Sequence, residues 1–143
     1  MITLDYNFLK AKYDRKRPFV PLNIINPHAN NLSQKIFCLL DTGADDCLFN
    51  IETVNSLEHD LKAEGVEPKS KTGISGNSVP VWPHTFILQL LHPNGTDVVW
   101  ESDQILIDCH ESYNVPNILG TDNFLKEFTI TFDYQNEIAT MIW

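Results

Sequence analysis

A carboxylate that directly follows an apolar strand is the feature that most constrains this chain. The run Ile36–Leu40 is continuously apolar, which predicts a short strand buried on both faces. Asp41 comes next and is followed by Thr42 and Gly43. Because burying a carboxylate is costly unless its charge is used or shared, this triplet is either a tightly hydrogen-bonded turn or half of a catalytic carboxylate pair. The segments that follow in the chain favour the second interpretation.

The composition is that of one ordinary globular domain. The chain has 143 residues, of which 43% are hydrophobic and 20% charged, so we expect a single domain over residues 1–143. Its formal net charge of -9 disfavours nucleic acid as a partner, because the phosphate backbone would be repelled. No apolar stretch approaches the length of about 18 residues that a membrane span requires, so no membrane partner is expected.

Cysteines and histidines give no sign of a metal or cofactor. The three cysteines cannot all pair, none forms a CxxC motif, and no His/Cys group has the spacing of zinc ligands. We therefore expect no metal, no cofactor, and reduced thiols in a cytoplasmic protein. The charged segment 1–17 lacks the apolar stretch of a signal peptide and leaves three interpretations open: a propeptide, an extra strand or a disordered arm.

Short apolar segments separated by turn residues predict a mainly β barrel or sandwich. Apolar and polar residues alternate most clearly over residues 128–134. Further strands are expected over residues 18–25, 36–40, 79–91, 98–100, 104–107 and 138–143. One helix is expected over residues 51–62, where apolar side chains recur near helical spacing before a stop at Gly65.

Three segments, in this order, resemble parts of the retroviral-type aspartic proteases, the retropepsins. Residues 39–45 (Leu-Leu-Asp-Thr-Gly-Ala-Asp) are similar to their active-site motif, and residues 72–76 (Thr-Gly-Ile-Ser-Gly) to the tip of their flap. Residues 118–120 (Ile-Leu-Gly) are similar to the element before their one regular helix, which residues 124–127 would continue here. The resemblance covers residues 18–143. It implies a retropepsin-like acid-protease barrel with one or two short helices, active as a two-fold dimer.

The resemblance also implies a role for each residue of the Asp-Thr-Gly loop. Asp41 is expected to supply the catalytic carboxylate, and Thr42, Gly43 and Ala44 to support it. Gly43 lets the backbone approach the carboxylate and offer it an N–H group. The hydroxyl of Thr42 can reach a second copy of the loop, and Ala44 is small enough to lie beside a substrate backbone.

Substrate binding is expected to involve the residue after this loop and the flap. The residues concerned are Asp45, Gly73, Ile74, Ser75 and Gly76. A flap that closes over an extended peptide offers it backbone hydrogen bonds, and glycines permit the hinge. The implied partner is therefore an extended peptide or protein substrate.

One carboxylate is not enough for the hydrolysis that the resemblance implies. One group must accept a proton from water while another donates a proton to the carbonyl oxygen. The chain has no second Asp followed by Thr or Ser and then Gly, so we expect a symmetric homodimer that brings Asp41 of both copies together. As in aspartic proteases generally, two carboxylates this close hold one proton between them. The repulsion between two acidic subunits then predicts stronger dimerisation and activity at about pH 4–6 than at pH 8.

One position departs from the retropepsin pattern and keeps an alternative open. Thr121 stands where retropepsins usually have an Arg, which pairs with the Asp at the position of Asp45. The alternative is a non-cleaving module of the same fold that binds peptides or dimerises. An unrelated small β-barrel that binds a small ligand is a third, weaker interpretation. The retained Asp41 favours the endopeptidase, because a pure binder has no use for a lone buried carboxylate.

Overall fold

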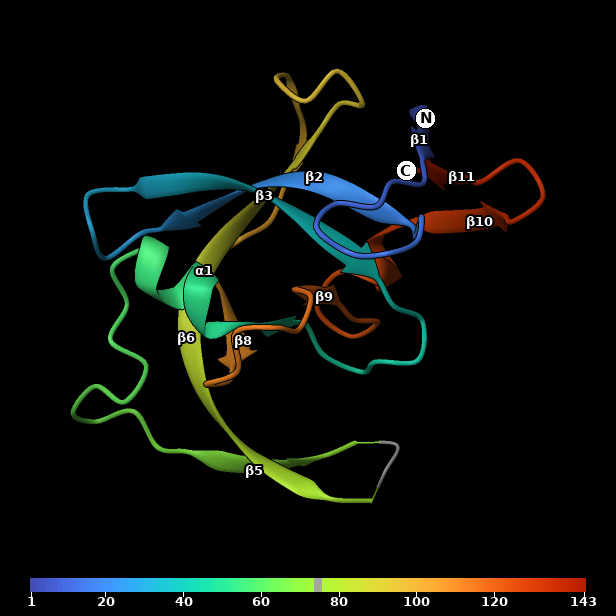
Figure 1. Ribbon diagram of the computed structural model, residues 1–143. Helices are drawn as coiled ribbons and strands as arrows, with labels where there is room; N and C mark the ends of the chain where they lie inside the picture. Colours follow the sequence, from blue (N-terminus) through green and yellow to red (C-terminus); the bar gives the residue numbers. More distant parts are fainter. Residues whose placement is uncertain (74–75) are drawn as a thin grey trace.

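The structure is a computed structural model that describes residues 1–73 and 76–143, and it is mainly β, as the sequence predicts (Figure 1). The described strands are β1 (Thr3–Asn7), β2 (Phe19–Asn26), β3 (Leu32–Leu40), β4 (Leu48–Phe49), β5 (Lys69–Thr72), β6 (Ser78–Leu91), β7 (Val98–Glu101), β8 (Ile105–Cys109), β9 (Ile118–Leu119), β10 (Thr129–Asp133) and β11 (Ile138–Ile142). The described helices are α1 (Ile51–Ser56) and the 3₁₀ turn η1 (Leu125–Glu127). Within these residues no helix is both long and apolar enough to cross a membrane.

Most of the strands form one sheet that closes on itself. Its strand order is β2-β3-β9-β4-β8-β6-β5, and an additional pairing of β2 with β6 closes the strands from β2 to β6 into a barrel, with β5 extending beyond it. The interior is filled by fully buried side chains from most of these strands: Leu22, Ile24, Phe49, Phe86, Leu88, Ile107 and Leu119. Burying a side chain of this size stabilises the fold by roughly 1.5–3 kcal/mol.

The strand that leads to Asp41 differs from its prediction. The apolar run suggested burial on both faces, but β3 begins at Leu32 and its burial alternates. Cys38 and Leu40 are buried in the barrel, whereas Phe37 is 41% exposed. The prediction was wrong because apolar residues can also occupy the outer face of a strand, and alternation of burial cannot be inferred when both faces are apolar.

The predicted helix over residues 51–62 is much shorter in the structure. Asn50 caps α1 through its side chain, which accepts a hydrogen bond from the Thr53 N–H, and the helix ends after Ser56. Glu58 has a φ of 57°, a left-handed conformation that stops helical hydrogen bonding. Leu57 and Leu61 are nevertheless buried, so their spacing reflects packing of the following loop.

The chain after Gly120 also departs from the expected helix. Residues 124–127 contain only the 3₁₀ turn η1 in place of a regular helix. Phe124 is fully buried, and its ring lies edge-on to Trp100 at a centroid distance of 5.3 Å. Aromatic packing therefore fixes this segment with a single helical turn.

A second sheet joins the two ends of the chain (Figure 1). Its order is β1-β11-β10, so β11 is the central strand and is paired along both edges. Residues 3–7, in the N-terminal segment whose role the sequence left open, form β1 and pair antiparallel with β11. Backbone hydrogen bonds between Ile2 and Trp143 extend this pairing.

Candidate active site

Asp41 lies at the point where β3 leaves the barrel. Its backbone N–H donates to the carbonyl of Leu119 on the neighbouring strand at 3.1 Å, which continues the pairing of β3 with β9. Its Oδ1 accepts a hydrogen bond of 2.9 Å from the N–H of Gly43. A Cβ at position 43 would lie 3.3 Å from that same oxygen, so a larger residue there would crowd the carboxylate. The loop therefore fixes a half-buried carboxylate through its own backbone.

Residues 120–123 hold the other side of this loop. The N–H groups of Thr121 and Asp122 donate to the carbonyls of Ala44 and Asp45 at 2.9 and 2.7 Å. A Cβ at Gly120 would overlap the backbone of Asp46, so the two segments can approach this closely only with glycine there. Thr121, which replaces the expected Arg, thus contacts the backbone of the Asp45 segment.

A cleft of about 650 Å³ separates the Asp41 loop from the flap strands. Its lining includes these site residues predicted from the sequence: Asp41, Gly43, Ala44, Asp45 and Gly73. Of the other predicted residues that the structure describes, Thr42 and Gly76 lie outside this lining. Ile74 and Ser75 fall outside the described residues.

The predicted flap is a hairpin of β5 and the first part of β6. The two strands pair antiparallel from Lys69↔Val81 to Thr72↔Ser78. Gly76 has a φ of 79°, the left-handed region that glycine adopts without strain, and its N–H donates to the carbonyl of Gly73. The hairpin extends from the barrel on the side to which the loop after β3 also turns (Figure 1).

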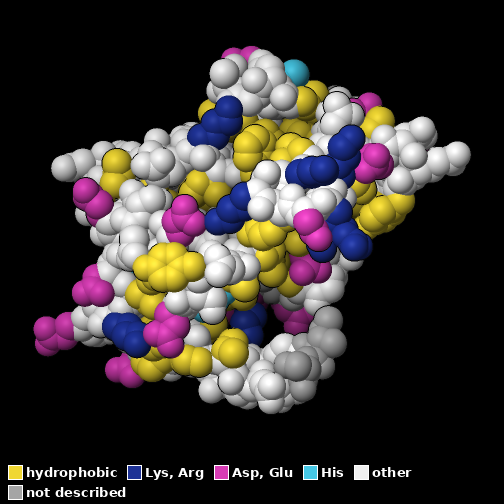
Figure 2. Space-filling view, viewed as in Figure 1, with side chains coloured by type: hydrophobic (Ala, Val, Ile, Leu, Met, Phe, Trp, Pro, Cys, Tyr) yellow, Lys and Arg dark blue, Asp and Glu magenta, His cyan; other side chains and the backbone are white. Residues whose placement is uncertain are grey.

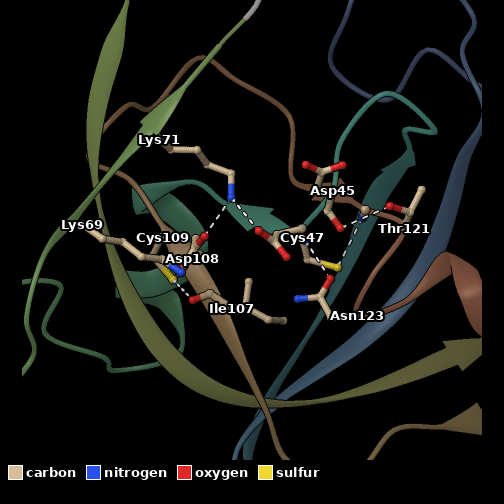
Figure 3. A network of polar contacts seen from close by, with 11 residues as sticks. Asp45, Cys47, Lys69, Lys71, Ile107, Asp108, Cys109, Thr121 and Asn123 are labelled. Atoms are coloured by element: carbon tan, nitrogen blue, oxygen red, sulfur yellow. Dashed lines mark hydrogen bonds and ion pairs between the residues drawn. The ribbon is translucent and has the colours of Figure 1, made fainter.

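A group of four charged residues at the base of this hairpin was missed by the sequence analysis (Figure 3). Lys71 Nζ lies 2.8 Å from Asp108 Oδ2 and 3.1 Å from Asp46 Oδ2. Lys69 Nζ lies 3.0 Å from Asp108 Oδ1. We call these four residues the flap-root ion cluster. The sequence offered a signal in Asp108 itself, a charged residue inside the apolar segment Ile105–Cys109.

Burial and charge act against each other in this cluster. The side chain of Asp108 is 5% exposed and that of Lys71 26% exposed. Burial alone would lower the pKa of Lys71, but the hydrogen bonds to Asp108 and Asp46 outweigh it and raise that pKa above its usual value. Lys71 therefore stays protonated and supplies the counter-charge without which the buried Asp108 carboxylate would be costly.

The cysteine thiols lie outside the cleft lining in the part of the chain that the structure describes. Cys38, Cys47 and Cys109 are buried and free, and burial raises the pKa of Cys47 to about 12, which keeps it a thiol. Among the described residues, no group of three or more His, Cys, Asp or Glu side chains is arranged to hold a metal ion.

Comparison with known proteins gives a clear result at the level of structure. No protein-family model and no curated protein sequence matches the chain. A retropepsin-like aspartic protease from Rickettsia conorii superimposes with a TM-score of 0.59 at 17% identity, covering 98% of this chain and 91% of that one. The chain has a retropepsin-like fold. EIAV protease complexed with the inhibitor HBY-793 gives a TM-score of 0.53 at 19% identity, covering 79% of this chain and 89% of that one.

This likeness confirms the predicted fold. Both similar structures are proteases by name, and both match along most of their length. At such low sequence identity the similarity shows the fold alone, and the chemistry depends on the residues of this chain. Those residues place Asp41 and the flap strands on a shared cleft.

Proposed function

We propose that this chain is an aspartic endopeptidase that works as a homodimer, with Asp41 of both copies as the catalytic pair. The observation that carries the proposal is the position of Asp41, at the edge of the 650 Å³ cleft that the flap strands cover, in a chain with a retropepsin-like fold. The hydrogen bond from Gly43 N–H fixes Oδ1, and the proposal assigns the reacting group to Oδ2.

The reaction follows from two carboxylates that share one proton. The ionised carboxylate takes a proton from a water molecule, whose oxygen attacks the carbonyl carbon of the peptide bond. The protonated carboxyl gives its proton to the carbonyl oxygen, which yields a gem-diol without a covalent enzyme intermediate. Transfer of a proton to the amide nitrogen then breaks the C–N bond and releases the two peptides.

An extended peptide suits the open edge of the flap. In the part of the chain that the structure describes, β5 pairs with β6 along one edge, which leaves the other edge for backbone hydrogen bonds to a substrate strand. Backbone hydrogen bonds of this kind do not distinguish one substrate side chain from another. Specificity must therefore come from the side chains that line the cleft.

The arrangement of the terminal sheet bears on how a second copy could dock. The loop after β3, the flap hairpin and the β10–β11 hairpin all extend toward the same side of the molecule (Figure 1). Because β11 is already paired with β1 and β10, a partner has the outer edges of β1 and β10 available. Thr42 is exposed and free to reach a partner's loop.

A non-cleaving module of the same fold is the second candidate. The observation that favours it is Thr121, which meets the Asp45 segment through the backbone and through a 3.4 Å contact of its hydroxyl with the Asp45 carbonyl. A neutral contact of this kind braces the loop less strongly than an Arg–Asp ion pair would. A weaker dimer would leave the cleft able to bind peptides while the carboxylate pair forms rarely.

Cleavage of a diverse peptide mixture, analysed by mass spectrometry at several pH values between about 4 and 8, tests the proposal. Wild-type protein should cut, Asp41→Asn should not, and Asp103→Asn, an exposed control outside the cleft lining, should cut like the wild type. Sedimentation of the same samples reports the dimer. A dimeric wild-type protein that cuts nothing would favour the non-cleaving module.

A further inference from the structure

The wall of the cleft beneath the flap is charged. All four residues of the flap-root ion cluster line the same cleft as Asp41. Figure 2 shows basic and acidic side chains at the hollow between the flap hairpin and the body of the molecule. The charges come from three places in the chain: Asp46 follows the catalytic loop, Lys69 and Lys71 lie on β5, and Asp108 lies on β8.

Strand geometry directs these side chains into the cleft. Lys69 and Lys71 are two residues apart on β5, so both point to the same face of the hairpin. That face is the one turned toward β8, because both ammonium groups reach the carboxylate of Asp108. Asp108 in turn lies between β4 and β6, opposite Leu48 and Pro83.

The cluster keeps hydrogen-bonding capacity that the described residues do not use. The ammonium of Lys71 has three N–H donors, and within the described residues the cluster uses two of them, toward Asp108 and Asp46. Asp46 engages Lys71 through Oδ2, and its side chain is 40% exposed. A donor on Lys71 and an acceptor on Asp46 are therefore presented side by side, in a group of two lysines and two aspartates whose formal charges cancel.

We propose that Lys71 and Asp46 form a subsite that selects a substrate side chain bearing a carboxamide, that of Gln or Asn. A carboxamide carbonyl accepts from Lys71 while its NH₂ group donates to Asp46. An apolar side chain would remove water from both charges and return no hydrogen bond. An acidic or a basic side chain would add an unbalanced charge to a neutral cluster. This inference rests on the proposed function of the cleft.

The test uses a peptide that the wild type cuts, made in four forms with Gln, Leu, Glu or Lys at the position that contacts the subsite. To identify the substrate position that contacts the subsite, each position on either side of the cut is varied in turn. The wild type should prefer Gln over Leu by about tenfold in kcat/KM, since a site built for hydrogen bonds rejects a side chain that cannot make them. Lys71→Met should abolish or reverse that preference.

A second variant keeps the test valid if Lys71→Met fails to fold. Asp46→Asn preserves the shape of the side chain and leaves the pair between Lys71 and Asp108 in place. Because it removes one negative charge, we expect the preference to move from Gln toward Glu by about tenfold. Lys12→Met is the matched control: Lys12 forms an exposed ion pair with Glu52 and lies outside the cleft lining.

Failure of this inference is distinguishable from failure of the proposed function. If the wild type cuts peptides but favours Leu, or if neither variant changes its preference, the subsite assignment is wrong and the protease stands. If a folded, dimeric wild type cuts nothing, extended peptides that carry a statine unit are made with Gln, Leu, Glu or Lys at each neighbouring position in turn, and their binding is measured by calorimetry. Tighter binding of the Gln form that Asp46→Asn removes supports the subsite on a binding module, and equal or absent binding overturns it.

Discussion

Asp41 and Asp108 belong to the same cleft but have opposite surroundings. Asp41 is half-buried, and within the described residues its side chain accepts one hydrogen bond, from a backbone N–H two residues away. Asp108 is almost fully buried, and both of its oxygens face lysine ammonium groups from the flap. Across residues 1–73 and 76–143, the Asp41 carboxylate has no cationic partner, whereas the charge of Asp108 is balanced by lysines.

Under the proposed function, this contrast is the one expected between a catalytic carboxylate and a structural one. A catalytic carboxylate must exchange a proton during the reaction, so strong fixed counter-charges would hold it in one state. A structural carboxylate benefits from such charges, because breaking a buried ion pair on one side is far more costly than never having buried it. The proposed dimer would give Asp41 its missing neighbour in the form of a second carboxylate.

The largest expected effect is on the chemistry of Asp41. Asp41→Asn removes the group that accepts a proton from water, and we expect cleavage to fall by at least about 10³-fold. Its free energy of unfolding should change by less than about 0.5 kcal/mol, since the residue is half-buried and bonds through a backbone N–H. Parallel cleavage assays and urea unfolding measure both. A strongly destabilised variant would show that Asp41 is a structural residue like Asp108.

The reverse pattern is expected at Asp108. Asp108→Asn leaves Lys71 and Lys69 without their shared counter-charge, and we expect a loss of about 3 kcal/mol in the free energy of unfolding. Glu111→Gln is the matched control, because Glu111 forms an ion pair with Lys62 in which both side chains are more than half exposed. That change should cost less than about 1 kcal/mol. Equal losses in the two variants would contradict the structural role given to Asp108.

A substitution at Gly120 tests how far the Asp41 loop and the flap-root ion cluster depend on each other. A methyl group at this position would overlap the backbone of Asp46, which follows the Asp41 loop and belongs to the flap-root ion cluster. We expect Gly120→Ala to cost about 2 kcal/mol and to lower cleavage as well, because the loop must shift. Gly73→Ala, where a Cβ meets nothing within 4 Å, is the control for stability. An unchanged free energy of unfolding in Gly120→Ala would mean that the Asp41 loop can shift at little energetic cost.

The same contrast explains what could be predicted from the sequence. Asp41 and Gly43 form a local motif, in which the residues that interact are neighbours in the chain. Their interaction can therefore be predicted from the sequence alone. Lys71 and Asp108 are 37 residues apart and meet only because β5 folds over β8. No local pattern encodes that meeting. A mainly β fold was predictable from short apolar segments and the barrel from the resemblance, whereas the length of α1 was not, because Leu57 and Leu61 are buried although the helix ends before them.

The smallest expected effect is a pH dependence that separates the stability of the barrel from the chemistry of the cleft. The ring of His59 lies 4.8 Å from that of His84, and burial together with that neighbour outweighs its hydrogen bond to Thr85 and lowers the pKa of His59. The unfolded chain, with a His pKa of about 6.5, therefore binds a proton first as the pH falls. His59 should then reduce the free energy of unfolding below about pH 6.5 and leave it unchanged at higher pH.

Activity is expected to rise over the same range, because it depends on the carboxylate pair. Thermal unfolding of His59→Gln between about pH 5 and 8 should show a shallower decline than wild type. Identical slopes in the two proteins would mean that His59 titrates as freely in the folded barrel as in the unfolded chain.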